Sequence, residues 1–147
     1  MSTPKPATAI RHAFEQPVRI RFAHCDPAGI VFFPQYLVLT NNLVEDWVGD
    51  ALGLPYSELL TRRRTGLPTV SLQCEFTAIS RMGELVTMGL GVERLGGRSI
   101  TLAIGCRLGD EQRMRIRQVL VCTSLDTHQA IDIPHDLRSA IQRFAAA

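Results

Sequence analysis

Apolar and polar residues alternate with a period of two along much of the chain, which is typical of β-strands with one buried face. The stretches with this pattern are Pro17–Ala23, Val70–Thr77, Glu84–Leu95, Arg98–Leu108 and Gln112–Ser124. In the first of them Val18, Ile20 and Phe22 share the apolar side. Gly96–Gly97 and Gly109–Asp110 separate the last three stretches and are hairpin turn signals. We therefore predict five strands, four of them in hairpin succession.

One long segment has the helical period instead. At 100° per residue, the apolar residues between Tyr36 and Ala51 fall on one broad arc, and Pro34 suits a first helical position. The opposite arc carries the polar positions Gln35, Asn42, Glu45 and Gly49. A shorter helical turn is expected around Tyr56 to Arg63, and Pro134 opens a final amphipathic helix.

This order of elements predicts an α+β fold in which the long helix covers one face of an antiparallel sheet. The other face should be polar, and Arg113, Arg115 and Arg117 suit a solvated face because Met114 and Ile116 alternate with them. With 147 residues the chain suits a single domain. We expect Met1–Gln16 to be a flexible lead-in and residues 17–147 to form the domain.

Composition narrows the classes of function. The net charge of +2 is too small to indicate a nucleic acid or a membrane surface as partner. The four cysteines form no C-x-x-C pair, and neither they nor the four histidines have the spacing of metal ligands. The N-terminal stretch lacks a signal-peptide core, and no apolar run is long enough for a membrane helix. We expect a cytoplasmic protein without a metal or other cofactor.

The turn after the first strand has the residues for carbonyl chemistry. Asp26 precedes a Pro–Ala–Gly turn that leads into the N-terminus of the long helix, where unpaired N–H groups can stabilise an anion. A carboxylate at this place can act as nucleophile or hold a water as general base. It can equally be a cap or a loop-stabilising acceptor, although it stands too far before Pro34 to cap that helix directly.

The string Asp26–Pro27–Ala28–Gly29–Ile30–Val31–Phe32–Phe33–Pro34–x–Tyr36 resembles the signature of the 4-hydroxybenzoyl-CoA thioesterase family of the Pseudomonas type. The resemblance extends from about Pro17 to Ser124. It includes Gly66–x–Pro68–x–Val70–Ser71 and Gly83–Glu84–Leu85–Val86. It implies a hotdog fold, an antiparallel five-stranded sheet wrapped around one long helix. It also implies homodimers joined edge to edge with shared active sites, and in many members homotetramers.

The resemblance also implies roles for single residues. Asp26 corresponds to the catalytic carboxylate, the N–H of Phe33 to the oxyanion donor, and Gly29 to the tight loop that exposes this donor. Tyr36 and Asn41 correspond to substrate-binding positions. Arg98, Ser99 and the weaker candidate Arg94 correspond to positions near the nucleotide of coenzyme A, whose phosphates attract basic residues.

The resemblance implies hydrolysis of an acyl-CoA, with an aromatic, hydroxybenzoyl-like acyl group. The family's name-giving enzyme has an aspartate where this chain has Asn41, and an amide accepts a phenol hydroxyl less strongly than a carboxylate does. The acyl group therefore stays open between another aromatic and a medium-chain one. Two alternatives are a hotdog hydratase or dehydratase and a non-catalytic acyl-CoA binding protein. The first usually needs a histidine near the helix, and none lies between positions 25 and 127.

Overall fold

A five-stranded antiparallel sheet in the order β1-β4-β5-β6-β3 forms the centre of the computed structural model, which describes residues 13–146. Its strands are β1 (Phe14–Arg19), β3 (Thr69–Phe76), β4 (Leu85–Leu95), β5 (Ser99–Leu108) and β6 (Glu111–Val121). Consecutive hairpins join β4, β5 and β6, as the glycine pairs predict. The predicted succession of four strands is wrong for β3, which pairs with β6 and not with β4. A second sheet of two short strands, β2 (Thr65–Gly66) and β7 (Thr123–Ser124), was not foreseen.

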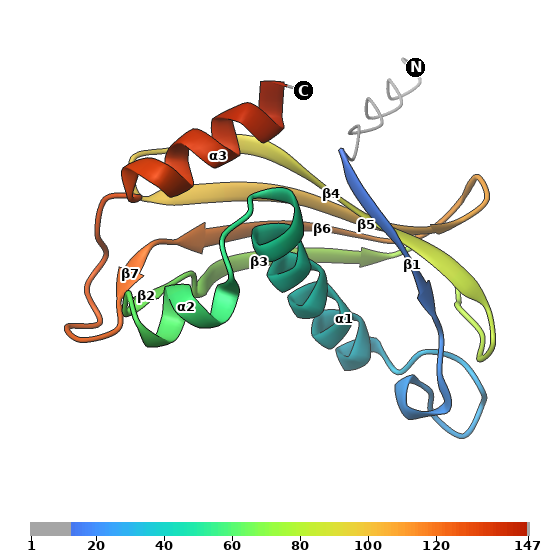
Figure 1. The fold of residues 1–147 in the computed structure, drawn as a ribbon. Helices are drawn as coiled ribbons and strands as arrows, with labels where there is room; N and C mark the ends of the chain where they lie inside the picture. The colour runs from blue at the N-terminus through green and yellow to red at the C-terminus, as the bar shows by residue number, and fades with distance from the viewer. Residues whose placement is uncertain (1–12, 147) are drawn as a thin grey trace, which may run out of the picture.

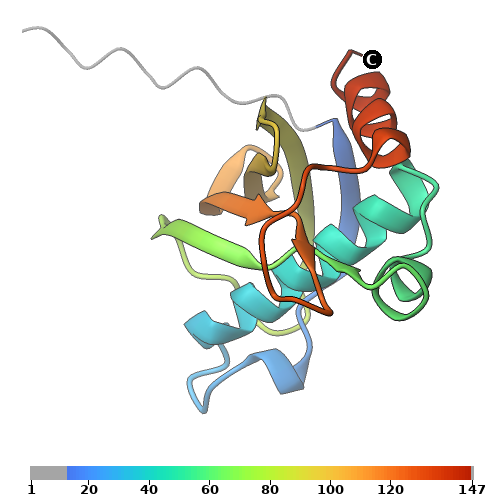
Figure 2. The same cartoon turned by 90° about the vertical axis from the view of Figure 1, so that its left-hand side faces the viewer.

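The long helix α1 (Phe33–Asp46) crosses one face of the curved sheet, and its last turn widens into the π-helix η2 (Trp47–Ala51) (Figures 1 and 2). Together the two cover the range predicted for the helix. Leu43 and Trp47 are fully buried in one core with inward residues of the central strands. The predicted antiparallel sheet with a long helix on one face is confirmed.

Two further helices complete the fold. The short helix α2 (Tyr56–Thr61) follows η2, and α3 (His135–Ala146) packs its apolar face near the C-terminal end of α1, where the rings of Trp47 and Phe144 meet edge to face at 5.6 Å. No helix within residues 13–146 has both the length and the apolar character needed to cross a bilayer.

The first strand lies earlier in the chain than the alternation predicts. β1 begins at Phe14 and pairs with β4 up to the partners Arg19 and Leu85, so residues 14–16 belong to the sheet and not to a lead-in. The rest of the expected lead-in, residues 1–12, lies outside the described residues. Because β4 starts at Leu85, the chain has no strand partner beyond Ile20, and Phe22 opens the 3₁₀ helix η1 (Phe22–His24) with 83% of its surface exposed. The predicted burial of Phe22 is therefore wrong.

Arg113 also departs from the predicted solvated face. Cys106 pairs with Met114, whereas the next residue of β5, Arg107, pairs with Gln112, so Arg113 is the extra residue of a β-bulge. A bulge changes the direction of a side chain, and Arg113 is only 4% exposed. Arg115 and Arg117 have no bulge and keep the predicted exposed face. Arg115 forms an ion pair with Glu75 of the adjacent strand β3, and Arg117 forms one with Glu93 of β4, two strands away.

Candidate active site

The site loop (residues 25–32) is a narrow hairpin between η1 and α1. The N–H of Asp26 donates to the Ile30 carbonyl at 3.0 Å, and the N–H of Phe32 donates to the His24 carbonyl at 2.9 Å. At the tip the N–H of Gly29 donates to the Asp26 carbonyl. Gly29 has a φ of +76°, a backbone conformation that is unfavourable for residues with a side chain. Backbone pairing thus folds Asp26 back toward the residues that lead into α1.

Asp26 has one carboxylate oxygen engaged and one available. Oδ1 accepts the N–H of Ala28 at 2.8 Å, a local turn contact that holds the carboxylate in place. No hydrogen bond among the described residues uses Oδ2. The loop-stabilising role considered from the sequence is therefore real, and it leaves an oxygen free to act on a ligand.

The N-terminus of α1 supplies the second group. Phe33 is the first residue of the helix, so its N–H has no carbonyl of a preceding turn to bond, and Pro34 has no N–H. No hydrogen bond among residues 13–146 uses the Phe33 N–H, and Phe32 provides no side-chain cap. The positive end of the helix dipole adds to this donor. The arrangement can stabilise an oxyanion beside a carboxylate.

His24 and Cys25 flank Asp26 without joining it. Nδ1 of His24 accepts the N–H of Arg21 at 2.9 Å, so the ring bonds its own turn. Partial burial, and then the Arg21 charge, lower the pKa of His24, which keeps the ring neutral at pH 7. Burial and the Asp26 carboxylate raise the pKa of the Cys25 thiol. Neither residue is poised as an acid, base or nucleophile here.

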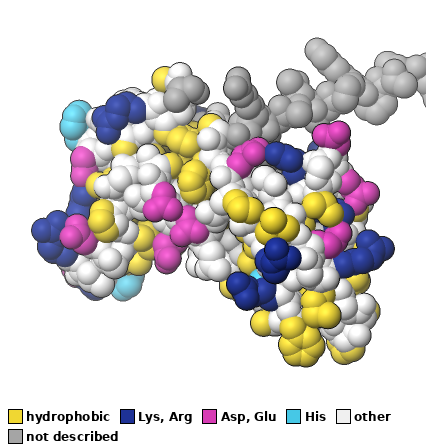
Figure 3. Space-filling model, turned by 45° about the vertical axis from the view of Figure 1, so that its right-hand side comes forward, with side chains coloured by type: hydrophobic (Ala, Val, Ile, Leu, Met, Phe, Trp, Pro, Cys, Tyr) yellow, Lys and Arg dark blue, Asp and Glu magenta, His cyan; other side chains and the backbone are white. Residues whose placement is uncertain are grey.

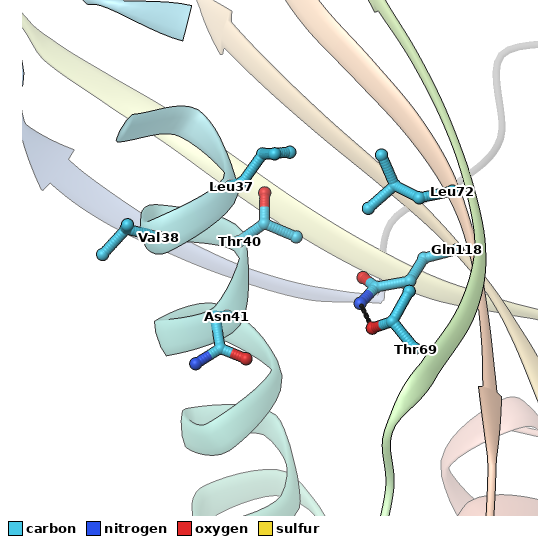
Figure 4. Close-up of a pocket in the computed structure, with 7 residues that line it drawn as sticks. All are labelled: Leu37, Val38, Thr40, Asn41, Thr69, Leu72 and Gln118. Carbon is cyan, nitrogen blue, oxygen red and sulfur yellow. Dashed lines mark hydrogen bonds between the residues drawn. The ribbon is translucent and has the colours of Figure 1, made fainter. Parts of the chain in front are cut away.

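A groove of about 360 Å³ opens between α1 and β3 (Figure 4). Its lining residues are Leu37, Val38, Thr40, Asn41, Thr69, Leu72 and Gln118. Asn41 is among them; its substrate-binding role, which the resemblance implies, stays a prediction. The groove begins one turn after the Phe33 end of the helix.

Two buried polar atoms face this groove, and the sequence analysis did not predict their residues as part of the site. Thr40 and Gln118 are 2% and 5% exposed, and neither Oγ1 of Thr40 nor Oε1 of Gln118 has a hydrogen-bond partner among the described residues. The amide nitrogen of Gln118 donates to Thr69 Oγ1 at 2.7 Å (Figure 4). Gln118 stands between Ile116 and Leu120 on the apolar side of β6. A polar residue at such a position could have indicated this site from the sequence.

Tyr36 lies below the surface of the site. It is 4% exposed, and its hydroxyl donates to Ser80 Oγ at 2.7 Å. Burial is the main cause that raises the pKa of Tyr36, so the hydroxyl stays protonated. In this chain the side chain ties the first turn of α1 to the segment before β4.

The predicted CoA-binding residues lie at the opposite end of the sheet from Asp26 (Figure 1). Arg98 and Ser99 follow the β4–β5 turn, and Arg98 forms an exposed ion pair with Asp132 at 3.0 Å. Arg94 is exposed near the end of β4. One chain by itself does not bring these residues to Asp26, so their role remains a prediction that depends on a second chain.

Apolar surface is concentrated around the site loop and the edge strand. Large hydrophobic side chains exposed in this part are Phe22, Phe32, Phe33, Leu37, Val38, Val70, Leu72, Phe76, Ile79, Met82 and Leu85. Figure 3 shows hydrophobic side chains gathered at the lower end of the molecule. Within residues 13–146 no group of His, Cys, Asp and Glu side chains is arranged to hold a metal ion.

Comparison with known proteins identifies the family of the chain. The chain matches the family model of the thioesterase-like superfamily over residues 20–141. No curated protein matches it.

Solved structures of similar fold include a 1,4-dihydroxy-2-naphthoyl-CoA thioesterase from Synechocystis, with 20% identity, a TM-score of 0.80, and coverage of 88% of this chain and 95% of that one. A gentisyl-coenzyme A thioesterase has 24% identity, a TM-score of 0.79, and coverage of 87% and 99%. A Staphylococcus aureus protein solved in complex with CoA has 12% identity, a TM-score of 0.82, and coverage of 90% and 84%. At these identities the likeness establishes a shared fold.

Proposed function

Because this chain belongs to the thioesterase-like superfamily, whose general reaction is thioester hydrolysis, we propose that it hydrolyses an aromatic acyl-CoA to the free acid and CoA. The observation that carries the proposal is that one available group lies in the site loop and a second lies directly after it, at the start of α1. Asp26 has a free carboxylate oxygen, and the Phe33 N–H at the start of α1 is a free donor. These are the two groups that attack on a thioester carbonyl requires.

The proposed reaction starts with the acyl carbonyl oxygen against the Phe33 N–H and its carbon facing Asp26. Attack by Oδ2 forms a carbon–oxygen bond and pushes electrons onto the carbonyl oxygen, which the N–H and the helix dipole stabilise. Collapse breaks the carbon–sulfur bond, releases CoA as a thiolate that takes up a proton, and leaves a mixed anhydride that water opens. In the general-base route Asp26 instead takes a proton from the attacking water. Neither route uses a metal or a redox cofactor.

The groove supports an acyl ring with a polar substituent. Leu37, Val38 and Leu72 give it apolar walls, and Thr40 and Gln118 give it unpartnered polar atoms at depth. A buried acceptor without a partner is costly, and Gln118 Oε1 can accept only from a donor such as a hydroxyl. A hydroxyaryl group satisfies both features. Two proteins of the same fold are named for hydroxyaryl CoA esters, which is consistent with this choice.

We further propose that two chains join their β3 edges to complete each site. The Phe76 end of β3 lies beside the site, where the rings of Phe33 and Phe76 are 6.1 Å apart. The Thr69 end lies by Leu120 of β6, whose next residue pairs with Ser99. Antiparallel pairing of two β3 strands therefore places the Thr69 end of one chain, with its Arg98 and Ser99, toward Asp26 of the other. Many dimers of this type pair again as tetramers, which we also expect here.

The test is release of free thiol from a panel of CoA esters: 4-hydroxybenzoyl, benzoyl, hexanoyl and a crotonyl control. We expect Asp26→Asn to lower kcat at least about 10²-fold, because the amide is neither a nucleophile nor a base. Hydroxybenzoyl-CoA should be cleaved faster than benzoyl-CoA. Glu45→Gln is the matched control, since Glu45 is an exposed carboxylate on the opposite arc of α1.

The alternatives make different predictions in the same assay. A hydratase would consume crotonyl-CoA with loss of its conjugated absorbance and without thiol release. A binding protein would show CoA ester binding by calorimetry without turnover. Equal rates for wild type and Asp26→Asn on every ester would end the proposal.

A further inference from the structure

We propose that Arg113 is a positioning residue for this reaction, because it holds the backbone on which the site loop is built. The kinetic part of this inference rests on the proposed hydrolase function. Its starting point is the β-bulge in β6, which turns a residue of the solvated arginine row into the interior. A buried guanidinium requires partners for its donors, and those partners reveal what it holds.

The guanidinium of Arg113 binds the anchor loop (residues 77–84), which connects β3 to β4. Nη1 donates to the Ile79 carbonyl at 2.6 Å and to Glu84 Oε1 at 2.9 Å, and it lies 3.4 Å from Ser80 Oγ. Nη2 donates to Glu84 Oε2 at 3.3 Å. Nε faces Glu111 Oε1 at 2.6 Å as an ion pair without hydrogen-bond alignment. One planar cation thus fixes both ends of a six-residue stretch from Ile79 to Glu84.

The bulge also fixes the anchor loop through its backbone. The Arg113 carbonyl accepts the N–H groups of Thr77 and Ala78 at 3.0 and 3.3 Å. The hydroxyl of Thr77 donates to the carbonyl of Gln112 at 2.7 Å. The loop is therefore attached to β6 at its start by the bulge backbone and further along by the guanidinium.

The anchor loop in turn pairs with the site loop. The N–H of Val31 donates to the Ser80 carbonyl at 2.9 Å, and the N–H of Met82 donates to the Gly29 carbonyl at 3.0 Å. These bonds flank a β-bridge between Ile30 and Arg81. Gly29 and Val31 lie between the catalytic carboxylate and the oxyanion donor, so the position of the anchor loop sets the spacing of the two reacting groups.

A second branch reaches the helix. Ser80 Oγ, which lies beside the guanidinium, accepts the hydroxyl of Tyr36, three residues after Phe33 in α1. Arg113 therefore acts on both sides of the site: on the site loop through the Ser80 carbonyl and the Met82 N–H, and on the first turn of α1 through the Ser80 side chain. A lysine keeps the charge but cannot reproduce the fork, so it cannot hold Ile79, Ser80 and Glu84 together.

The kinetic test compares Arg113→Lys with Arg115→Lys, a matched change two residues away on the same strand at an exposed ion pair. We expect Arg113→Lys to lower kcat about 10- to 100-fold with KM within about twofold, because misplacement of reacting groups affects the transition state and not ester binding. Arg115→Lys should leave both constants unchanged. Ser80→Ala is a smaller change and should also lower kcat. It replaces Arg113→Lys in this test if that variant does not fold.

A second readout does not depend on activity. Amide hydrogen exchange should become at least about tenfold faster in peptides covering residues 26–33 of Arg113→Lys and Ser80→Ala, while peptides of the central strand β5 keep wild-type protection. Arg115→Lys should match wild type throughout. The inference is overturned if the site-loop peptides keep their protection, or if kcat is unchanged in a folded Arg113→Lys variant. If wild type hydrolyses no ester but Arg113→Lys still shows faster exchange in residues 26–33, the hydrolase function is refuted. The role of Arg113 in holding the site loop then stands.

Discussion

The two halves of α1 have opposite surroundings. From Leu39 onward its apolar side is sealed in the core, where Leu43 and Trp47 have no exposed surface. Before Leu39 the same helix leaves Phe33 58%, Leu37 37% and Val38 50% exposed, and it ends at an unpaired N–H. One half stabilises the fold by removing apolar surface from water, whereas the other half leaves such surface available.

The exposed half is nevertheless held in place, by hydrogen bonds between polar side chains. The Tyr36 hydroxyl, Ser80, Arg113 and Glu84 form a buried hydrogen-bonded series beneath it. Arg113 Nε forms only an ion pair, but the directional hydrogen bonds of the other groups specify one geometry more strictly than apolar packing does. We infer that the core half of α1 determines stability, and that the exposed half determines the geometry of the site and of the proposed dimer.

The largest stability difference should come from two leucines of this helix. Leu43→Ala removes a fully buried side chain and should lower the free energy of unfolding by about 2–5 kcal/mol, whereas Leu37→Ala should lower it by less than about 1 kcal/mol. Urea unfolding followed by circular dichroism measures both. Similar losses for the two variants would remove the distinction between the halves.

The second largest effect should come from a charge placed in the proposed dimer interface at β3. Val70 is 59% exposed on β3, and Val70→Lys would bury an unpaired ammonium in the proposed interface. We expect the dimer dissociation constant to rise at least about tenfold, which corresponds to about 1.4 kcal/mol, and thioester hydrolysis to fall with it. Light scattering at decreasing concentration measures this change.

Gln73→Lys is the control for the edge, because it adds the same charge to the same strand at a position that pairs with Arg117 on the solvated face of the sheet. We expect this variant to remain a dimer. A Val70→Lys protein that stays dimeric and active would place the interface elsewhere.

The smallest expected effect is the pH dependence of the stability that the Arg113–Glu84 ion pair contributes. Hydrogen bonds from Arg113 and from the Arg81 N–H lower the pKa of Glu84 below its ordinary value of 4.5. The carboxylate therefore contributes stability above that value and loses it as the pH falls through the lowered pKa. The stability advantage of wild type over Glu84→Gln should shrink between about pH 6 and pH 3.

Asp136→Asn separates this local effect from general acid sensitivity. Hydrogen bonding to Arg63 lowers the pKa of Asp136 in the same direction, but on α3, away from the site. Only the Glu84→Gln change should alter exchange in the site-loop peptides. An advantage of wild type over Glu84→Gln that stays constant with pH would show that the ion pair does not form.

Much of this protein could be predicted from local pattern. The period of two located the strands β3 to β6 but misplaced β1. The helical period located α1 and η2 as one segment, and the glycine pairs located the hairpins from β4 to β6. The turn after Asp26 and the helix start at Phe33 are also local features, since proline, glycine and the missing helical acceptors act within a few residues. The catalytic roles of these residues stay predictions.

Other features depend on pairing between distant segments. Phe22 continues the alternation but is exposed, because β4 offers no partner beyond Ile20. Arg113 continues the row of Arg115 and Arg117 but is buried, because the register of β5 against β6 inserts one extra residue there. Alternation along one strand contains no information about the register of its neighbour.

The loop from Asp26 to Phe33 shows both kinds of determination. Its residues alone decide that a carboxylate, a tight turn and a helix start follow one another, because each of these is a short-range property of the backbone. Only the tertiary structure decides how far apart the carboxylate and the donor are held. That spacing depends on an anchor loop some 50 residues away in sequence and on a guanidinium from β6 that is buried only once the whole sheet has formed.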